Sequence, residues 1–166
     1  AVTSGTFNVA LGRGSLTADT LGQRSVALGT FALEAQNFTT ATEVYNTAVG
    51  HGTGASISTG KQNVIVGGLA GLYSTTTDNC TFVGYQAGQG INGTKLTGNN
   101  NTAVGATAGL LLQGAAENNS LLGFGAGVAI TTATGNTLIG SDAGNAITTG
   151  QDNVMVGYVS GTHGSD

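Results

Sequence analysis

Hydrophobic residues recur along this chain in a short pattern that ends on glycine. The clearest copy is Asn136-Thr137-Leu138-Ile139-Gly140, and nine such copies follow one another along the sequence. Their closing glycines are Gly12, Gly29, Gly50, Gly67, Gly84, Gly105, Gly123, Gly140 and Gly157. The step from one of these glycines to the next is about 17 residues, lengthening to about 21 residues in two units, and a nearly fixed period of this kind is typical of stacked-repeat proteins.

Each copy is apolar at more positions than one buried face requires. The third residue after the Asn position is always a large aliphatic, and the first is Val, Thr or Ser. Because a strand places these two residues on the same side, we interpret them as the wall of the core. The residue between them, such as Ala48, Ile65 or Leu138, would point the other way, yet it is apolar in every copy. We expect another chain to cover this second face, since an exposed apolar stripe is an association surface.

The rest of each unit reads as turns and a second β-prone run. A small residue and usually a glycine follow the closing glycine, and a run such as Ile147-Thr148-Thr149-Gly150 ends the unit. The sequence therefore predicts an all-β fold, a repetitive β-solenoid or β-roll of nine coils, each about 17–21 residues long. We expect one domain over residues 1–166, each coil being strand, turn, strand, turn, in an intertwined or side-by-side homotrimer. At about 4.8 Å per coil, the stack would be roughly 40 Å long.

Asparagine opens most of the copies. Stacked asparagine side chains can hydrogen-bond from coil to coil, as they do in cross-β stacks. Asparagine also favours the turn that precedes a strand, and the sequence leaves both readings open. The predicted structural positions are the closing glycines from Gly50 onward together with Asn46, Asn63, Asn101, Asn119, Asn136 and Asn153.

The two units of about 21 residues carry extra residues after the glycine turn, within 30–46 and 85–101. Insertions in solenoids project as loops, frequently on a binding face, although they can equally be inert bulges. The candidate binding residues in these loops are Glu34, Gln36, Asn37, Phe38, Asn92 and Lys95.

Composition and charge narrow the function classes. Gly occurs 30 times, Pro is absent and only 7% of residues are charged, but the 39% that are hydrophobic recur at fixed places, which favours an ordered chain. A net charge of −4 with four basic residues argues against binding to nucleic acid. No apolar run approaches membrane-spanning length. Since no initiator Met or signal peptide opens the sequence, we interpret it as a piece of a longer protein.

No constellation of residues points to catalysis or to a bound cofactor. The acidic residues form no close pair in sequence, whereas a glycosidase needs two carboxylates at a set separation. His51 and His163 have no Cys or His partner at metal-ligand spacing. The lone Cys80 occupies the Asn position of its copy and is expected to be a packed structural thiol. We therefore expect no enzyme activity, metal or cofactor.

The repeats resemble those of known fibre proteins. The pieces Asn101-Thr102-Ala103-Val104-Gly105-Ala106-Thr107-Ala108-Gly109 and 147–157 resemble repeats of bacteriophage tail-fibre proteins and related secreted bacterial fibre proteins. The first two units, Asn8–Ser15 and Ser25–Gly29, resemble the head repeat of trimeric autotransporter adhesins, although the period here is longer than in that head. We accordingly distinguish adhesin-head-like coils at 1–45 from tail-fibre-like coils at 46–166. The resemblance implies a homotrimer that forms a stiff shaft or head.

Four functions are consistent with these observations. The leading one is a structural segment of a phage tail fibre or tail-like particle, located on the virion and supporting attachment to a host surface. The second is an adhesin on a bacterial surface that contacts a host glycan or protein. An enzymatic tailspike is disfavoured by the missing carboxylate pair. An ice-binding solenoid would need a flat array of threonines. The threonine pairs at 75–76, 131–132 and 148–149 suggest such an array but do not recur in every coil.

Overall fold

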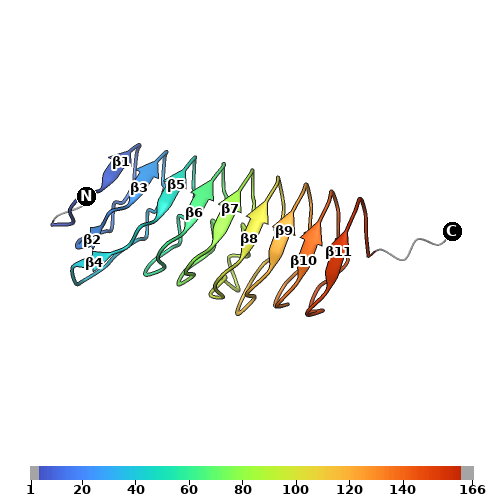
Figure 1. Ribbon diagram of the computed structural model, residues 1–166. Helices are drawn as coiled ribbons and strands as arrows, with labels where there is room; N and C mark the ends of the chain where they lie inside the picture. Colours follow the sequence, from blue (N-terminus) through green and yellow to red (C-terminus); the bar gives the residue numbers. More distant parts are fainter. Residues whose placement is uncertain (1–3, 162–166) are drawn as a thin grey trace.

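A computed structural model describes residues 4–161 of the chain. Successive coils stack side by side into an elongated body, with the first and the last described coils at opposite ends of the stack (Figure 1). Within the described range there is no helix, and the predicted all-β solenoid is confirmed. Each coil contributes one short strand to a nine-stranded sheet. These strands are β1 (Val9–Leu11), β3 (Val26–Leu28), β5 (Thr47–Val49), β6 (Val64–Val66), β7 (Thr81–Val83), β8 (Thr102–Val104), β9 (Ser120–Leu122), β10 (Thr137–Ile139) and β11 (Val154–Val156).

The sheet is parallel, and every strand pairs with the equivalent strand of the next coil. Thr47 of β5 pairs with Val64 of β6, for example, and Thr137 of β10 pairs with Val154 of β11. The order runs from β1 through β3 and β5 to β11 without a crossover, and it continues across residues 45 and 46. A second, two-stranded sheet joins β2 (Gly22–Gln23) to β4 (Thr42–Glu43).

The closing glycine ends each strand because no other residue fits there. Gly84 has a φ of 134°, and a Cβ atom on it would lie 2.6 Å from the carbonyl oxygen of Gly105 in the next coil. Gly67 repeats this geometry, with a φ of 123° and a Cβ position 2.5 Å from the carbonyl oxygen of Gly84. Both the backbone conformation and the contact between coils therefore exclude a side chain. The fixed place of glycine in the repeat follows from this double constraint.

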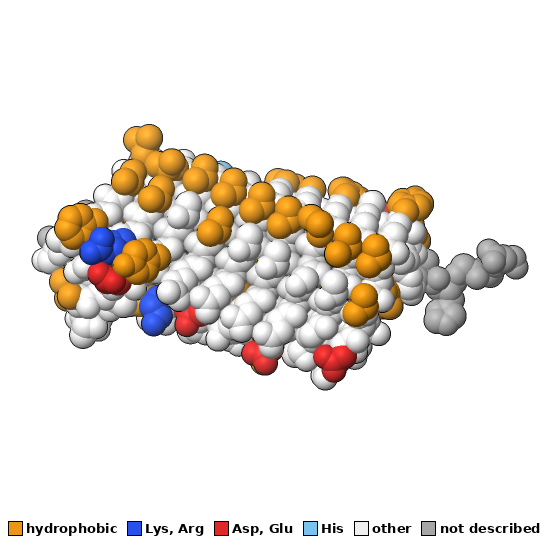
Figure 2. Space-filling model, viewed as in Figure 1, with side chains coloured by type: hydrophobic (Ala, Val, Ile, Leu, Met, Phe, Trp, Pro, Cys, Tyr) orange, Lys and Arg blue, Asp and Glu red, His pale blue; other side chains and the backbone are white. Residues whose placement is uncertain are grey.

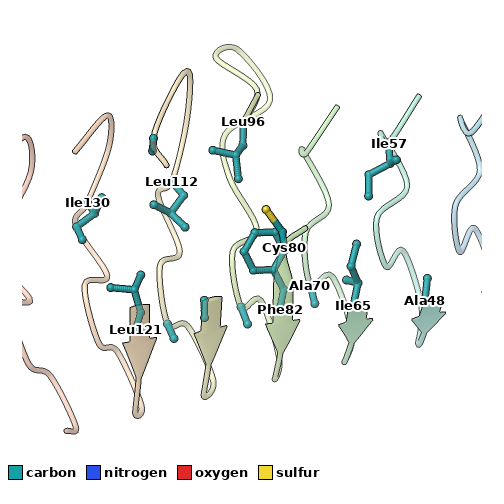
Figure 3. Close-up of a cluster of buried hydrophobic side chains, with 14 of the residues drawn as sticks. Ala48, Ile57, Ile65, Ala70, Cys80, Phe82, Leu96, Leu112, Leu121 and Ile130 are labelled. Carbon is teal, nitrogen blue, oxygen red and sulfur yellow. The ribbon is translucent and has the colours of Figure 1, made fainter. Parts of the chain in front are cut away.

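The middle residue of each strand from β3 to β10 in the nine-stranded sheet is buried in the core, which is the reverse of the predicted orientation. Ala48, Ile65, Phe82 and Leu138 are at most 1% exposed. By contrast, Leu11 is 71% exposed, Leu122 49% and Ile139 38%, although these third-position aliphatics were assigned to the core wall. The interior of the coil is closed by residues of the return path, including Ile57, Leu96, Leu112 and Ile130 (Figure 3). The prediction that each strand carries two apolar faces holds, but the two faces were assigned the wrong way round.

A narrow coil explains the reversal. So short a strand turns only its central side chain inward, and the small residues along the return path let the two walls approach closely. Ala70, Ala87 and Ala108 on the return path are fully buried. The largest core side chain, Phe82, lies where a Cβ atom on Gly88 would meet its ring at 2.5 Å. The core of each coil is thus narrow, and side chains from the strand meet side chains from the return path within it.

The return path of the coil is more irregular than predicted. Apart from β2 and β4, the second β-prone run of each described coil forms no strand. It still hydrogen-bonds to its neighbours, because Ser58 N donates to Thr75 O and Thr131 N donates to Thr148 O. The predicted sequence of two strands per coil is therefore wrong for most coils, while the stacking of the return paths is real.

The orientation of the strands can be tested with one substitution made on each face. Leu138→Ala removes a fully buried side chain and should lower the free energy of unfolding by about 2–5 kcal/mol per chain. Leu122→Ala removes the same atoms from a side chain that is 49% exposed, and its cost should be clearly smaller. Urea denaturation at several protein concentrations separates loss of coil stability from loss of association. If Leu122→Ala lowers the free energy of unfolding more than Leu138→Ala does, at every protein concentration, the orientation of the strands described here is wrong.

Candidate functional site

A ladder of asparagine side chains runs through the buried corner at the start of the sheet strands. The main-chain N and the Nδ2 atom of Asn63 both donate to Oδ1 of Asn46, at 3.0 and 3.1 Å. The Nδ2 atom of Asn63 also donates to the carbonyl oxygen of Thr77 in the next coil, at 2.7 Å. The same pattern joins Asn119 to Asn101, Asn136 to Asn119 and Asn153 to Asn136.

All six predicted asparagines take part in this arrangement, so the ladder is formed. Five of them are buried, and Asn153 in the last described coil is half-buried. Each amide satisfies main-chain groups of two neighbouring coils, which would otherwise be buried without partners. The predicted glycines from Gly50 onward all have a φ between 123° and 137°. These residues are therefore structural, and they hold the strands in register.

Where the ladder lacks asparagine at Ser25, a glutamine from the first long unit takes its place. The Nε2 atom of Gln36 donates to Oγ of Ser25 at 3.1 Å and to Oδ2 of Asp19 at 2.8 Å. Its Oε1 atom accepts a hydrogen bond from Nδ2 of Asn46 at 2.9 Å. Gln36 thus bridges the gap between the first coil and the continuous ladder. Sequence reasoning missed this role, although the Ser at a ladder position just before a long unit was the available signal.

The second gap in the ladder is Cys80, whose thiol lies where an amide would be. Its Sγ atom approaches the carbonyl oxygen of Asp78 at 3.5 Å and that of Gly98 at 3.9 Å, the two positions that ladder amides contact elsewhere. The neighbouring Asn101 acts to lower the pKa of this thiol, against the larger effect of burial. Cys80 is buried, as expected for a packed thiol, and this gap also comes just before a long unit.

The sheet strands present an apolar and uncharged surface to the outside. We call this surface the outer face; it consists of the first and third residues of the nine strands. Its third-position row is entirely Leu, Val or Ile, and its first-position row is Val, Thr or Ser. Exposure reaches 74% at Val154 and 67% at Val156. Hydrophobic side chains accordingly form a long band on the molecule (Figure 2).

Exposed aromatic side chains border the outer face. Tyr85, Phe124 and Tyr158 follow the closing glycines of their coils and are 56%, 59% and 79% exposed. Phe7 and Tyr45 precede the strands on the opposite edge and are 74% and 47% exposed. The aromatic rings therefore lie along both edges of the band, outside the outer face itself, and an extended apolar surface indicates a contact with another molecule.

The candidate binding residues of the two long units do not form one site. Glu34, Asn37, Asn92 and Lys95 are exposed. Gln36 is fully buried and Phe38 is 8% exposed, so the expectation that these two project outward is wrong. The second long unit does project a turn at Asn92 and Gly93, closed by an antiparallel bridge between Ile91 and Thr94. The two groups belong to different parts of the stack.

Neither a metal site nor a known relative marks out a function. Among the described residues no three His, Cys, Asp or Glu side chains gather as metal ligands, and His163 lies outside that range. The described chain also has no helix that is long and apolar enough to cross a membrane. Comparisons with protein families, curated proteins and solved structures find no match.

Replacing Cys80 with Asn should restore the ladder. An asparagine here would donate through Nδ2 to the carbonyl oxygen of Gly98 and offer Oδ1 to Asn101. We expect Cys80→Asn to raise the free energy of unfolding by about 0.5–1.5 kcal/mol. Cys80→Ala removes the contacts of the thiol with the carbonyl oxygens of Asp78 and Gly98 and should lower that free energy by about 1–3 kcal/mol. Denaturation of both variants in parallel is the measurement, and a loss of stability in both would contradict the proposed equivalence of thiol and amide.

Burial of the Cys80 thiol also makes stability depend on pH. Desolvation raises the pKa of this thiol from its ordinary value of 9.0 to about 11. Between these values the unfolded chain loses the proton that the folded chain keeps, so the folded state becomes less stable as the pH rises. Relative to Cys80→Ser, the wild type should lose about 1.4 kcal/mol per pH unit in this window. If the free energies of unfolding of the wild type and of Cys80→Ser change equally with pH between 9.0 and about 11, the burial of the thiol is contradicted.

Proposed function

We propose that this chain is a structural segment of a homotrimeric fibre, of the kind found in phage tail fibres and tail-like particles, and that it supports attachment to a host surface. The outer face carries the proposal. Three copies meet through this face, the coils of each copy stack along the fibre axis, and the chain acts by its shape and stiffness rather than by catalysis. The proposed location is extracellular, on a virion.

The chemistry of the outer face supports burial against protein. Parallel sheets in proteins are generally covered on both faces, and their strands are apolar on both sides, as these are. In a single chain the central residues of the strands between β1 and β11 are buried, whereas the third-position row is exposed at both ends of the stack. Covering that row removes apolar surface from water along the whole length of the sheet.

The lack of charge on the outer face supports a partner identical to the chain itself. Charged side chains at the same place on each copy would oppose one another when copies meet around an axis. The two rows of the outer face contain none, so identical faces can approach without that cost. The number of three copies comes from the resemblance of the repeats to trimeric fibre proteins. A trimeric adhesin on a bacterial surface is the alternative, and it would use the same assembly.

Assembly through the outer face predicts a mass and a variant that changes it. Multi-angle light scattering of this chain should give three times its mass of 16.2 kDa. Leu122→Asp places a carboxylate in the middle of the outer face and should shift the mass toward that of one chain. Thr132→Asp, at an exposed position of the return path, should leave the trimer intact.

Two further observations keep this experiment decisive. Far-ultraviolet circular dichroism shows whether Leu122→Asp still folds; if it does not, the milder Leu122→Thr should give a mass that falls on dilution. A well-folded wild-type monomer that persists at high concentration would overturn the proposal. An assembly that Thr132→Asp breaks and Leu122→Asp leaves unchanged would place the interface elsewhere.

A further inference from the structure

Three residues at one corner of the stack form a column that is unlike the rest of the molecule. Phe7, Arg24 and Tyr45 each stand immediately before the ladder position of three consecutive coils. The Cζ atom of Arg24 lies 5.0 Å from the centroid of the Phe7 ring and 5.9 Å from that of Tyr45. The guanidinium is therefore held between two aromatic rings. We call these residues, together with Glu43, the corner stack.

Glu43 fixes the orientation of the guanidinium. The Nε atom of Arg24 donates to Oε1 of Glu43 at 3.0 Å, and the Tyr45 hydroxyl donates to Oε2 at 2.8 Å. Strand β4 places Glu43 beside Gln23, the residue before Arg24. The hydrogen bond from Tyr45 and then the contact with Arg24 lower the pKa of the Glu43 carboxyl below its ordinary value. The carboxylate thus remains ionised and holds one side of the guanidinium.

The other end of Arg24 is open. Over residues 4–161, no side chain or main-chain oxygen accepts a hydrogen bond from its Nη1 or Nη2 atom. With Nε already occupied, this end presents a planar pair of donors to solvent. Such a pair matches the two oxygens of a carboxylate or a phosphate. The ring of Phe7 is 74% exposed and that of Tyr45 47%, so apolar surface adjoins these donors. Basic, acidic and hydrophobic side chains adjoin one another at this end of the molecule (Figure 2).

The backbone indicates that the fold alone does not require these side chains. Phe7, Arg24 and Tyr45 have φ values of 61°, 62° and 58°, a conformation that bulky residues rarely adopt. Later coils use Asn79, Asn100 and Asn118 at this place, and asparagine tolerates the conformation. Leu16 and Leu33 also have positive φ values, but both are completely buried, so packing offsets their strain.

Phe7 has no comparable offset. Its side chain is 74% exposed, whereas the coils after Tyr45 carry polar residues or glycine at this place, namely Gln62, Asn79, Asn100, Asn118, Gly135 and Asp152. Strain of this kind, kept without burial, clusters at binding sites.

We propose that the corner stack binds the carboxylate of an acidic sugar in a polysaccharide. The free end of Arg24 pairs with the carboxylate, and the sugar ring lies against the exposed surface of Phe7 and Tyr45. A singly charged carboxylate suits this place better than a doubly charged phosphate, because the Glu43 carboxylate stands beside it. The site goes beyond the fibre role, since it is formed within the first three coils of one chain.

Isothermal titration of the whole chain with methyl glucuronoside, methyl glucoside and glucose 6-phosphate tests the assignment. We expect the glucuronoside to bind at least about tenfold more tightly than the glucoside, because only the former carries a carboxylate. The phosphate sugar should bind more weakly than the glucuronoside. Arg24→Lys keeps the charge but loses the planar pair of donors, and it should weaken glucuronoside binding about tenfold or more.

A matched variant controls for general loss of positive charge. Arg13 lies over a single ring, that of Phe31 at 5.2 Å, and has no carboxylate partner among residues 4–161. Arg13→Lys should therefore leave binding unchanged. Equal affinity for glucuronoside and glucoside, or unaltered binding by Arg24→Lys, would overturn the proposal. Tighter binding of the phosphate sugar would overturn the choice of carboxylate. Light scattering on the same samples reports assembly separately, so failure of the site and failure of the fibre role are distinguishable.

Discussion

Hydrogen bonding between equivalent positions of successive coils is the interaction on which the structure depends. The sheet strands, the return paths and the asparagine amides all bond to their counterparts in the next coil. Because each coil encloses only a narrow core, apolar packing within a coil is modest, and stability accumulates through contacts between neighbouring coils. A residue that disturbs the register would affect several kinds of bond at once. This explains why the ladder is completed by Gln36 and Cys80 where asparagine is absent.

The architecture could be predicted from the sequence because period and residue type agreed at every copy. The orientation of the strands could not. In Asn136-Thr137-Leu138-Ile139-Gly140 both Leu138 and Ile139 are large and apolar, so the alternation rule gave no preference between them. The more regular third-position row was taken as the core, whereas it forms the outer face. Regularity at those positions reflects a surface that is apolar along the stack, and only the folded coil shows which row is enclosed.

For the candidate sites, too, the sequence predicted what depends on neighbouring residues and missed what depends on residues brought together by folding. The role of asparagine could be narrowed to two readings, and distances between side chains decided between them. Gln36 looked like a loop residue because the sequence does not show that the loop folds back onto the ladder. The column of Phe7, Arg24 and Tyr45 was equally hidden, since its members are separated by whole coils and become neighbours only through stacking.

The spacing of the strands is independent of the length of the coils that carry them. Short and long coils alike contribute one strand to the same sheet. The extra residues of the long coils lie in the return path. The rise per coil is set by the backbone at about 4.8 Å whatever the length of the loop. The length of the molecule is therefore set by the number of coils, and its cross-section is set separately by the length of the loops. Adding or removing whole coils would change the reach of such a rod in fixed steps, while loops could diversify without altering it.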